Sequence, residues 1–210
     1  MSELLLDIRD LVIEADIDGD WRPIVNGLSM GLHKGEIVGL IGESGAGKST
    51  FGLAGMGYTK PGCRIVSGSI KLEGEELVGA SPSRLREIRG NSVSYVAQSA
   101  AAAFNPAHRL ITQFVEAPVQ HGKMRSEEAA RRGQDLYRQL DLPDPEHIGN
   151  RFPHQVSGGQ LQRAMTAMAM GCDPRLIVFD EPTTALDVTT QIEVLSTIKE
   201  AVRARGVAAI

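Results

Sequence analysis

Apolar and polar residues alternate in short stretches over the first part of the chain. Residues 4–13 and residues 24–32 contain such alternation, which is typical of strands with one buried face. The polar segment 16–20 between them contains Gly19 and predicts a turn. Residues 37–41 read IVGLI, a continuous apolar run that predicts a fully buried parallel strand. This part of the chain is therefore expected to form three strands.

Helical and extended segments continue to alternate beyond this point. Residues 51–54 can continue a helix, and residues 67–72 predict a strand. Residues 82–89 predict a short basic helix, and residues 93–97 predict another buried strand. An order of this kind is typical of an α/β fold.

The strand pattern then disappears for about sixty residues. Residues 111–119 and 126–140 have helical periodicity. Ser126 is expected to cap the second helix, ahead of two glutamates in its first turn. One face of that helix is expected to contain Ala129, Gly133, Leu136 and Leu140.

The last part of the chain returns to alternating helix and strand. The predicted elements are a helix, a strand, a second helix and a second strand, at residues 158–170, 176–179, 189–203 and from Val207 onward. We infer a helical insertion at residues 98–160. The insertion lies inside an α/β core that consists of residues 1–97 and 161–210.

Composition and charge narrow the class of protein. The 210 residues are 42% hydrophobic and 23% charged, which is ordinary for a globular domain with one substantial core. The formal charge of −4 gives no electrostatic reason to expect nucleic acid as a partner. No apolar run approaches the ~18 residues of a membrane span, and acidic residues near the N-terminus do not fit a signal peptide. Cys63 and Cys172 match no metal-ligand spacing, so we expect two free, at least partly buried thiols in a cytosolic protein.

The segment between residues 37–41 and 51–54 carries the most specific chemistry. It reads GESGAGKST and contains in full the pattern G-x-x-x-x-G-K-[ST] of a phosphate-binding loop. A solvated Gly/Ser turn is the alternative, but it does not explain the strand before it and the helix after it. Lys48 is expected to reach the β- and γ-phosphates, and the Ser49 hydroxyl to ligate Mg²⁺. The expected nucleotide-binding residues are Gly42, Ser44, Gly45, Ala46, Gly47, Lys48, Ser49 and Thr50.

Two further segments have the residues of a nucleotide site. The apolar run 176–179 ends in Asp180 and Glu181, at the carboxyl edge where parallel sheets bind ligands. Asp180 is expected to hold Mg²⁺ through its water shell, and Glu181 to act as general base on the attacking water. Solvated acids at a strand end are the alternative, which the P-loop in the same chain disfavours. Residues 156–160 (VSGGQ) form a small-residue turn that leads into a helix, which suits either an anion or a simple serine cap.

Together these segments resemble the nucleotide-binding subunit of ATP-binding cassette (ABC) transporters over nearly the whole chain. The matching positions are Gly42 to Ser49 for the P-loop, Val156-Ser157-Gly158-Gly159-Gln160 for the signature, Asp180-Glu181 for the Walker B pair, Ala185-Leu186-Asp187 for the D-loop, Gln98 for the Q-loop and Trp21 for the adenine-stacking aromatic. Valine replaces the usual leucine at the start of the signature. A packed Trp21 without contact to adenine is an equally good reading.

The resemblance implies a fold and a mechanism. The fold would be a P-loop NTPase core with an N-terminal antiparallel β subdomain and a helical insertion subdomain. Two subunits, identical or sister, would pack head to tail around two ATP molecules, with Ser157 and Gly159 of one covering the γ-phosphate held by the other. Ser49, Gln98 and Asp180 would surround Mg²⁺, Lys48, Gln98 and Glu181 would be catalytic, and Asp187 would couple the two sites.

Residues 104–106 (FNP) and 181–191 (EPTTALDVTTQ) resemble the dipeptide, oligopeptide and nickel importer branch of the family. Between Gln98 and residues 104–106 the chain has Ser99 and four alanines, where that branch has a different string. The implied function is ATP hydrolysis that powers solute import through integral membrane permeases, at the inner face of the cell membrane. A periplasmic or extracellular solute-binding protein would take part indirectly.

Other readings stay open at the level of the sequence. One is an ABC protein without transport, such as a subunit of a phosphonate-cleavage complex, and another is a nucleotide-binding fragment with little hydrolysis. A chromosome-maintenance ATPase would have a long coiled coil between P-loop and signature, and a P-loop kinase or GTPase would leave residues 157–160 unexplained.

The family places a switch histidine at the end of the strand that here starts at Val207. The chain's five histidines lie elsewhere, at His33, His108, His121, His147 and His154. We therefore expect a truncated cassette that binds nucleotide, hydrolyses it poorly and exposes an apolar edge.

Overall fold

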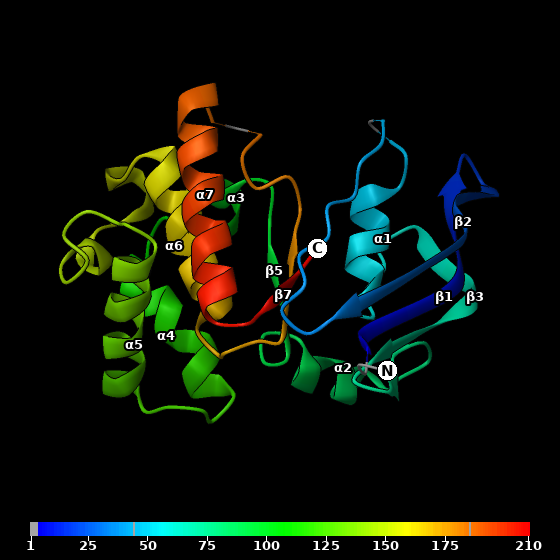
Figure 1. The fold of residues 1–210 in the computed structure, drawn as a ribbon, viewed down its shortest axis with the longest axis horizontal. Helices are drawn as coiled ribbons and strands as arrows, with labels where there is room; N and C mark the ends of the chain where they lie inside the picture. The colour runs from blue at the N-terminus through cyan, green and yellow to red at the C-terminus, as the bar shows by residue number, and fades with distance from the viewer. Residues whose placement is uncertain (1–3, 44, 185) are drawn as a thin grey trace.

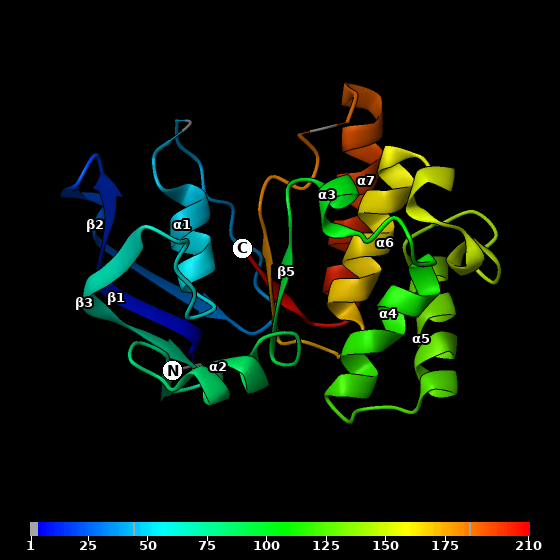
Figure 2. The same ribbon diagram turned by 180° about the vertical axis from the view of Figure 1, so that it is seen from behind.

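The computed structural model describes residues 4–43, 45–184 and 186–210. Figure 1 shows an antiparallel sheet on one side, short parallel strands in the middle and a group of helices on the other side. Helix α1 (Lys48–Ala54) stands between the antiparallel sheet and the parallel strands. The reverse view in Figure 2 shows the same order of layers. The predicted α/β class with an antiparallel subdomain is confirmed.

The antiparallel sheet has four strands in the order β2-β1-β3-β4. They are β1 (Leu4–Ile17), β2 (Asp20–His33), β3 (Cys63–Leu72) and β4 (Glu75–Glu76). The turn between β1 and β2 has positive φ at Asp18 (56°) and Gly19 (90°), the geometry that matches the twist of a tight hairpin. The predicted turn at residues 16–20 is thus confirmed, and both strands extend beyond their predicted limits.

The parallel strands form a three-stranded sheet in the order β5-β6-β7. They are β5 (Val93–Val96), β6 (Leu176–Phe179) and β7 (Ala208–Ala209). Helix α2 (Pro82–Ile88) precedes β5, and the Ser81 hydroxyl caps it by accepting from the Arg84 N–H at 3.2 Å. All of these elements occupy their predicted places.

The segment between β5 and β6 is helical, and the described residues within it contain no strand. It contains α3 (Ala100–Ala103), α4 (Leu110–Gln120), α5 (Ser126–Gln139), two short 3₁₀ turns (Ile148–Asn150 and Pro153–Gln155) and α6 (Gly158–Met170), and after β6 the chain forms α7 (Val188–Ala204). The predicted apolar face of α5 is buried. The cap prediction is wrong, because Arg125 occupies the N-cap position and Ser126 is the first helical residue.

The parallel strands separate two hydrophobic clusters because successive side chains point to opposite faces. Val93, Leu176 and Val178 pack with α1 and the antiparallel sheet. Val96 and Ile177 pack with the helices on the other side. Residues of β6 with even numbers therefore face α1. The same alternation continues past the end of β6, so the Asp180 side chain also lies on the side of α1.

The prediction of a buried strand at residues 37–41 is wrong. Ile37 forms an isolated parallel bridge with Ala209, and the Val38 N–H donates to the Ala209 carbonyl at 2.9 Å, but Ile41 is 99% exposed. The neighbouring β7 extends only over Ala208–Ala209, so the ladder ends there. An apolar cavity of about 400 Å³ lies alongside, with walls that include Leu40, Val178, Leu195 and Ile210.

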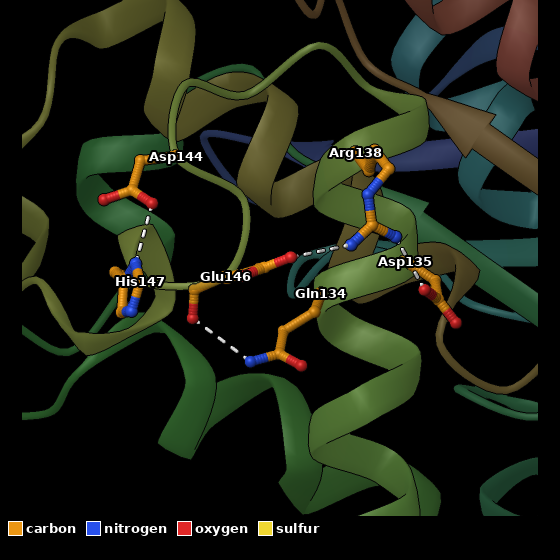
Figure 3. A network of polar contacts seen from close by, with 6 residues as sticks. All are labelled: Gln134, Asp135, Arg138, Asp144, Glu146 and His147. Atoms are coloured by element: carbon orange, nitrogen blue, oxygen red, sulfur yellow. Dashed lines mark hydrogen bonds and ion pairs between the residues drawn. The ribbon is translucent and has the colours of Figure 1, made fainter.

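A polar network connects α5 to the loop that follows it, as Figure 3 shows. Gln134 Nε2 donates to the Glu146 carbonyl at 3.1 Å, and Arg138 pairs with the Glu146 carboxylate at 3.5 Å. The Asp144 carboxylate lies 2.8 Å from Nδ1 of His147. These contacts fix the path of the chain between α5 and the first 3₁₀ turn.

Both cysteines are free thiols, as expected, with Cys63 half-buried and Cys172 buried. Burial raises the pKa of the Cys172 thiol. Among the described residues, no helix combines the length and apolar character that crossing a membrane requires.

Candidate functional site

The P-loop is held against β2 at the point where α1 begins. Gly47 is the N-cap residue of α1 and has φ 81°, a left-handed conformation that favours glycine. A Cβ atom at this position would lie 2.6 Å from the carbonyl oxygen of Ile24. Both the backbone angle and the close approach of β2 therefore require glycine.

Lys48 folds back over its own loop. Its Nζ donates to the carbonyl oxygens of Gly42 at 2.8 Å and Glu43 at 2.7 Å. The ammonium group is thus inside the curve of the loop, where the sequence predicts phosphates. Ser44, which was also predicted to bind nucleotide, lies outside the described residues.

Asp180 follows β6 and contacts two hydroxyl groups. Ser49 Oγ donates to Asp180 Oδ1 at 2.6 Å, and the Tyr95 hydroxyl donates to Oδ2 at 2.9 Å. The Asp180 N–H donates to the Val96 carbonyl at 2.9 Å, which extends the parallel ladder by one bond. The structure thus brings the P-loop serine and the strand-end acid together.

Glu181 turns away from Asp180 in a left-handed conformation with φ 45°. For a residue other than glycine this backbone costs about 1–3 kcal/mol, and such strain is concentrated at functional sites. Gln98 Nε2 donates to Glu181 Oε2 at 3.2 Å, and Thr184 Oγ1 donates to the same oxygen at 3.1 Å. Glu181 is therefore oriented by residues that follow two neighbouring parallel strands.

A cavity of about 330 Å³ lies beside these groups, and Asp180 itself lines the neighbouring apolar cavity of about 400 Å³. The walls of the smaller cavity are Ile24, Gly45, Gly47, Lys48, Ser49, Thr50, Lys60, Gln98 and Glu181. Lys60 was not predicted, because it comes from the segment that returns from α1 to β3 and belongs to no motif. Tyr95 was missed as well, although strand parity places it on the same face as Asp180. Of the other predicted residues, Gly42 and Ala46 are in the P-loop outside these walls.

Trp21 does not belong to the described walls of the smaller cavity. It lies in β2 close to the hairpin turn and is 40% exposed. The guanidinium group of Arg64 covers its ring, 3.9 Å from the ring centroid. Trp21 thus has a cation–π contact on its ring, and its role in stacking on adenine stays a prediction.

The VSGGQ segment forms the start of α6, separate from the described cavity walls. Ser157 caps the helix by accepting from the Gln160 N–H at 3.3 Å, and Gln160 Oε1 accepts from the Ser157 N–H at 3.0 Å. Ser157 and Gly158 are exposed, whereas Gly159 is buried against α7, where a Cβ atom would lie 2.8 Å from Thr190 Cγ2.

Asp187 performs the same capping role for α7. Its carboxylate accepts from the Thr190 N–H at 3.1 Å and from the Thr190 hydroxyl at 2.6 Å. The hydrogen bond from this hydroxyl lowers the pKa of Asp187. Ala185, the first residue of the predicted D-loop, lies outside the described residues.

Ser49 and Gln98 at the cavity wall, together with Asp180 next to Ser49, carry oxygen atoms that suit Mg²⁺. The Ser49 hydroxyl, the Asp180 carboxylate and the Gln98 side-chain amide are of the type that this cation prefers. Within the described ranges, no three His, Cys, Asp or Glu side chains gather into a metal-binding group. Mg²⁺ in nucleotide sites needs no such group, because phosphates and waters supply most of its ligands. The residues therefore fit Mg²⁺ bound together with a nucleotide.

A glycine-rich loop at a helix N-terminus, next to acids that follow a parallel strand, defines a nucleotide-binding domain of the P-loop class. The chain belongs to the ABC transporter family, because the sequence profile described as ABC transporter matches residues 25–184. That range contains the P-loop and the acidic pair.

Relatives that resemble the chain include ATP-binding proteins of peptide transporters. Oligopeptide transport ATP-binding protein OppD of Lactococcus lactis (strain IL1403) is 38% identical over 95% of the chain and 59% of its own length. Probable D,D-dipeptide transport ATP-binding protein DdpD of Escherichia coli (strain K12) is 38% identical over 100% of the chain and 64% of its own length. The chain thus spans about three fifths of the length of these relatives.

Solved structures share the fold. The ATP-binding cassette MJ0796, in a dimeric post-hydrolysis state bound to ADP and Pi, superposes with a TM-score of 0.82 at 22% identity and covers 97% of this chain and 85% of that one. CbiO1 from Clostridium perfringens, part of the ABC transporter complex CbiONQ, has a TM-score of 0.81 at 22% identity and covers 100% of this chain and 78% of that one. The family and fold inferred from the sequence are confirmed.

Proposed function

We propose that the chain binds and hydrolyses ATP to power the import of a peptide-type solute through membrane permeases. One observation carries the proposal: P-loop residues, Gln98 and Glu181 line a single cavity, and Asp180 is hydrogen-bonded to the P-loop Ser49, in a chain similar to ATP-binding proteins of peptide transporters. The proposal also includes nickel-type solutes, because residues 104–106 and 181–191 resemble the importer branch for dipeptides, oligopeptides and nickel.

Lys48 and Ser49 are proposed to hold the nucleotide. On binding, Lys48 would exchange the carbonyl oxygens of Gly42 and Glu43 for phosphate oxygens, which are stronger acceptors because they are charged. The Ser49 oxygen would ligate Mg²⁺ while its proton stays with Asp180, and Asp180 and Gln98 would lie around the ion. Bound Mg²⁺ neutralises charge that develops on the phosphates during transfer.

Glu181 is the proposed general base. Two donors hold its Oε2, from Gln98 and Thr184, so the carboxylate has a fixed direction with Oε1 available for the attacking water. The hydrogen bond from Gln98 also connects the Q-loop directly to this carboxylate, so a change at Glu181 would move Gln98. We propose that Gln98 transmits that movement to a permease subunit.

The functional unit is proposed to be a dimer in which the signature segment completes a partner's site. Ser157 and Gly158 are exposed at the N-terminus of α6, where backbone N–H groups favour an anion. Gly159 is buried against α7, so its close packing on that helix positions the segment, and Asp187 would couple the two sites. We propose residues 98–160 as the helical subdomain that carries this segment, in a subunit at the inner face of the membrane.

ATP binding by the whole chain tests the proposal most directly. Isothermal titration with ATP and Mg²⁺ should show binding by the parent and a loss of at least about tenfold in affinity for Lys48→Ala, because the variant lacks the cation that contacts two phosphates. Lys71→Ala removes an exposed lysine on β3 and is the matched control. Equal affinity in Lys48→Ala and Lys71→Ala would contradict the assignment of the site.

Glu181→Gln separates hydrolysis from binding in the same experiment. The variant should bind ATP like the parent but form a stable dimer with it on size-exclusion chromatography, because the amide cannot accept a proton from water. A variant that releases phosphate as fast as the parent would exclude Glu181 as the base. Import itself is tested by uptake of a labelled peptide in cells that carry Lys48→Ala in the full gene, where uptake should stop.

A further inference from the structure

Tyr95 contacts the candidate site although it belongs to no nucleotide-binding motif. Its hydroxyl donates to Asp180 Oδ2 at 2.9 Å, while Ser49 Oγ donates to Oδ1 at 2.6 Å. Both oxygens of one carboxylate are therefore held by hydroxyl groups, and these come from two different elements, β5 and α1.

The pairing of the parallel strands explains this contact. Tyr95 lies opposite Val178 in the β5–β6 ladder, so Asp180 is two residues further along and on the same face. A tyrosine side chain is long enough to span this diagonal. Its ring packs against the apolar cluster beneath α1, which fixes the direction of the hydroxyl.

The two hydroxyl groups differ in what nucleotide binding would require of them. Ser49 would ligate Mg²⁺ through an oxygen lone pair while its proton stays directed at Oδ1 of Asp180. Tyr95 can keep its bond to Oδ2 throughout, because its ring stays packed in the cluster.

On the basis of the proposed function, we propose that Tyr95 is a positioning residue for the Mg²⁺–nucleotide complex. Its hydroxyl holds Oδ2 of Asp180, so that Oδ1 stays directed toward Ser49, which would ligate the ion. Without this donor the carboxylate can rotate, and the ion loses part of its oriented shell. Residues that orient metal-bound groups in this way typically contribute about 10–100-fold to metal affinity.

The test measures how strongly Mg²⁺ and nucleotide binding are coupled. The dissociation constant of the fluorescent analogue mant-ATP is determined with excess Mg²⁺ and again with EDTA, and the ratio of the two constants gives the coupling. The proteins are the parent, Tyr95→Phe, which keeps the ring, and Tyr137→Phe. Tyr137 is a fully buried tyrosine among the helices on the other side of the parallel strands, so its variant is a matched control.

Tyr95→Phe should bind mant-ATP in EDTA within about twofold of the parent and lose about tenfold of the gain from Mg²⁺. Tyr137→Phe should keep the full gain. In an Asp180→Asn background, Tyr95→Phe should have no further effect, because the group that it orients is changed. A Tyr95→Phe variant that keeps the parental gain would overturn the inference, and so would an equal loss in EDTA and in Mg²⁺.

Failure of the proposed function has a different signature. A parent chain that does not bind mant-ATP contradicts the nucleotide site itself. A parent that binds the analogue with the same affinity in Mg²⁺ and in EDTA contradicts the metal site. Parental binding and coupling, together with unchanged coupling in Tyr95→Phe, contradict the role of Tyr95 alone.

Discussion

Gly47 shows how a single residue shapes the nucleotide loop. Its backbone is left-handed, and β2 leaves no space for a side chain next to the Ile24 carbonyl. Gly47→Ala should therefore lower the free energy of unfolding by two effects. The left-handed backbone costs about 1–2 kcal/mol in alanine, and the displaced contact adds about 1–3 kcal/mol. Urea unfolding of both proteins measures the difference.

Gly45→Ala is the control for this prediction. Gly45 also has a left-handed backbone, with φ 83°, but a Cβ atom there would meet nothing within 4 Å. It should lose the backbone contribution alone, about 1–2 kcal/mol. Equal losses in the two variants would mean that the contact with Ile24 is unimportant.

The sequence identified part of the site at the level of residues. Lys48, Ser49 and the acidic pair belong to motifs with fixed spacing, and the structure brings them together. Tyr95 and Lys60 could not be found in this way, because they reach the site through pairing of β5 with β6 and through the return of the chain toward β3. Parity along β5 would have indicated Tyr95, but only once its strand partner is known.

At the scale of elements, periodicity predicted most helices and strands, and its errors have local causes. Residues 37–41 have the composition of a buried strand, but a parallel strand also needs a neighbouring strand along its length. Among these five residues, only Ile37 forms a β-bridge with β7. The helix at Ala100–Ala103 was missed because four alanines give no periodicity. The Ser99 hydroxyl starts this helix by accepting from the Ala102 N–H at 3.3 Å.

The loop after α5 gives a prediction about pH. The hydrogen bond with Asp144 raises the pKa of His147. The stabilising contribution is thus complete below the ordinary histidine pKa of about 6.5 and is lost as pH rises through the raised value. NMR titration of the parent should give a His147 pKa above about 6.5, and Asp144→Asn should lower it.

Glu146, which belongs to the network in Figure 3, provides the control for the effect of Asp144 on the His147 pKa. The negative charge of Glu146 also raises the pKa of His147, but by less than Asp144 does. Glu146→Gln should therefore lower the His147 pKa by less than Asp144→Asn. If the two variants have the same effect, the hydrogen bond is not the main cause.

At the scale of the whole molecule, Asp173 connects helices from two parts of the chain. Its carboxylate pairs with Arg132 of α5 and, at 3.2 Å, with Arg205 at the end of α7. Arg205 Nε also donates to Gln139 Oε1 at 2.9 Å. Burial and the nearby Arg132 lower the pKa of Arg205, which shows that the two cations repel each other. Asp173 is the acid that holds them together.

Asp173→Asn should therefore destabilise the protein more than the loss of ordinary surface pairs, because the side chains of Arg132 and Arg205 are only 22% and 17% exposed. We expect a loss of about 1–2 kcal/mol, and for a chain of this length about 2–4 °C in melting temperature for each kcal/mol. Asp135→Asn breaks an exposed pair with Arg138 within α5 and should cost about 0.2–0.5 kcal/mol. Thermal unfolding followed by circular dichroism compares the two variants. Equal melting temperatures would show that Asp173 acts as an ordinary surface charge.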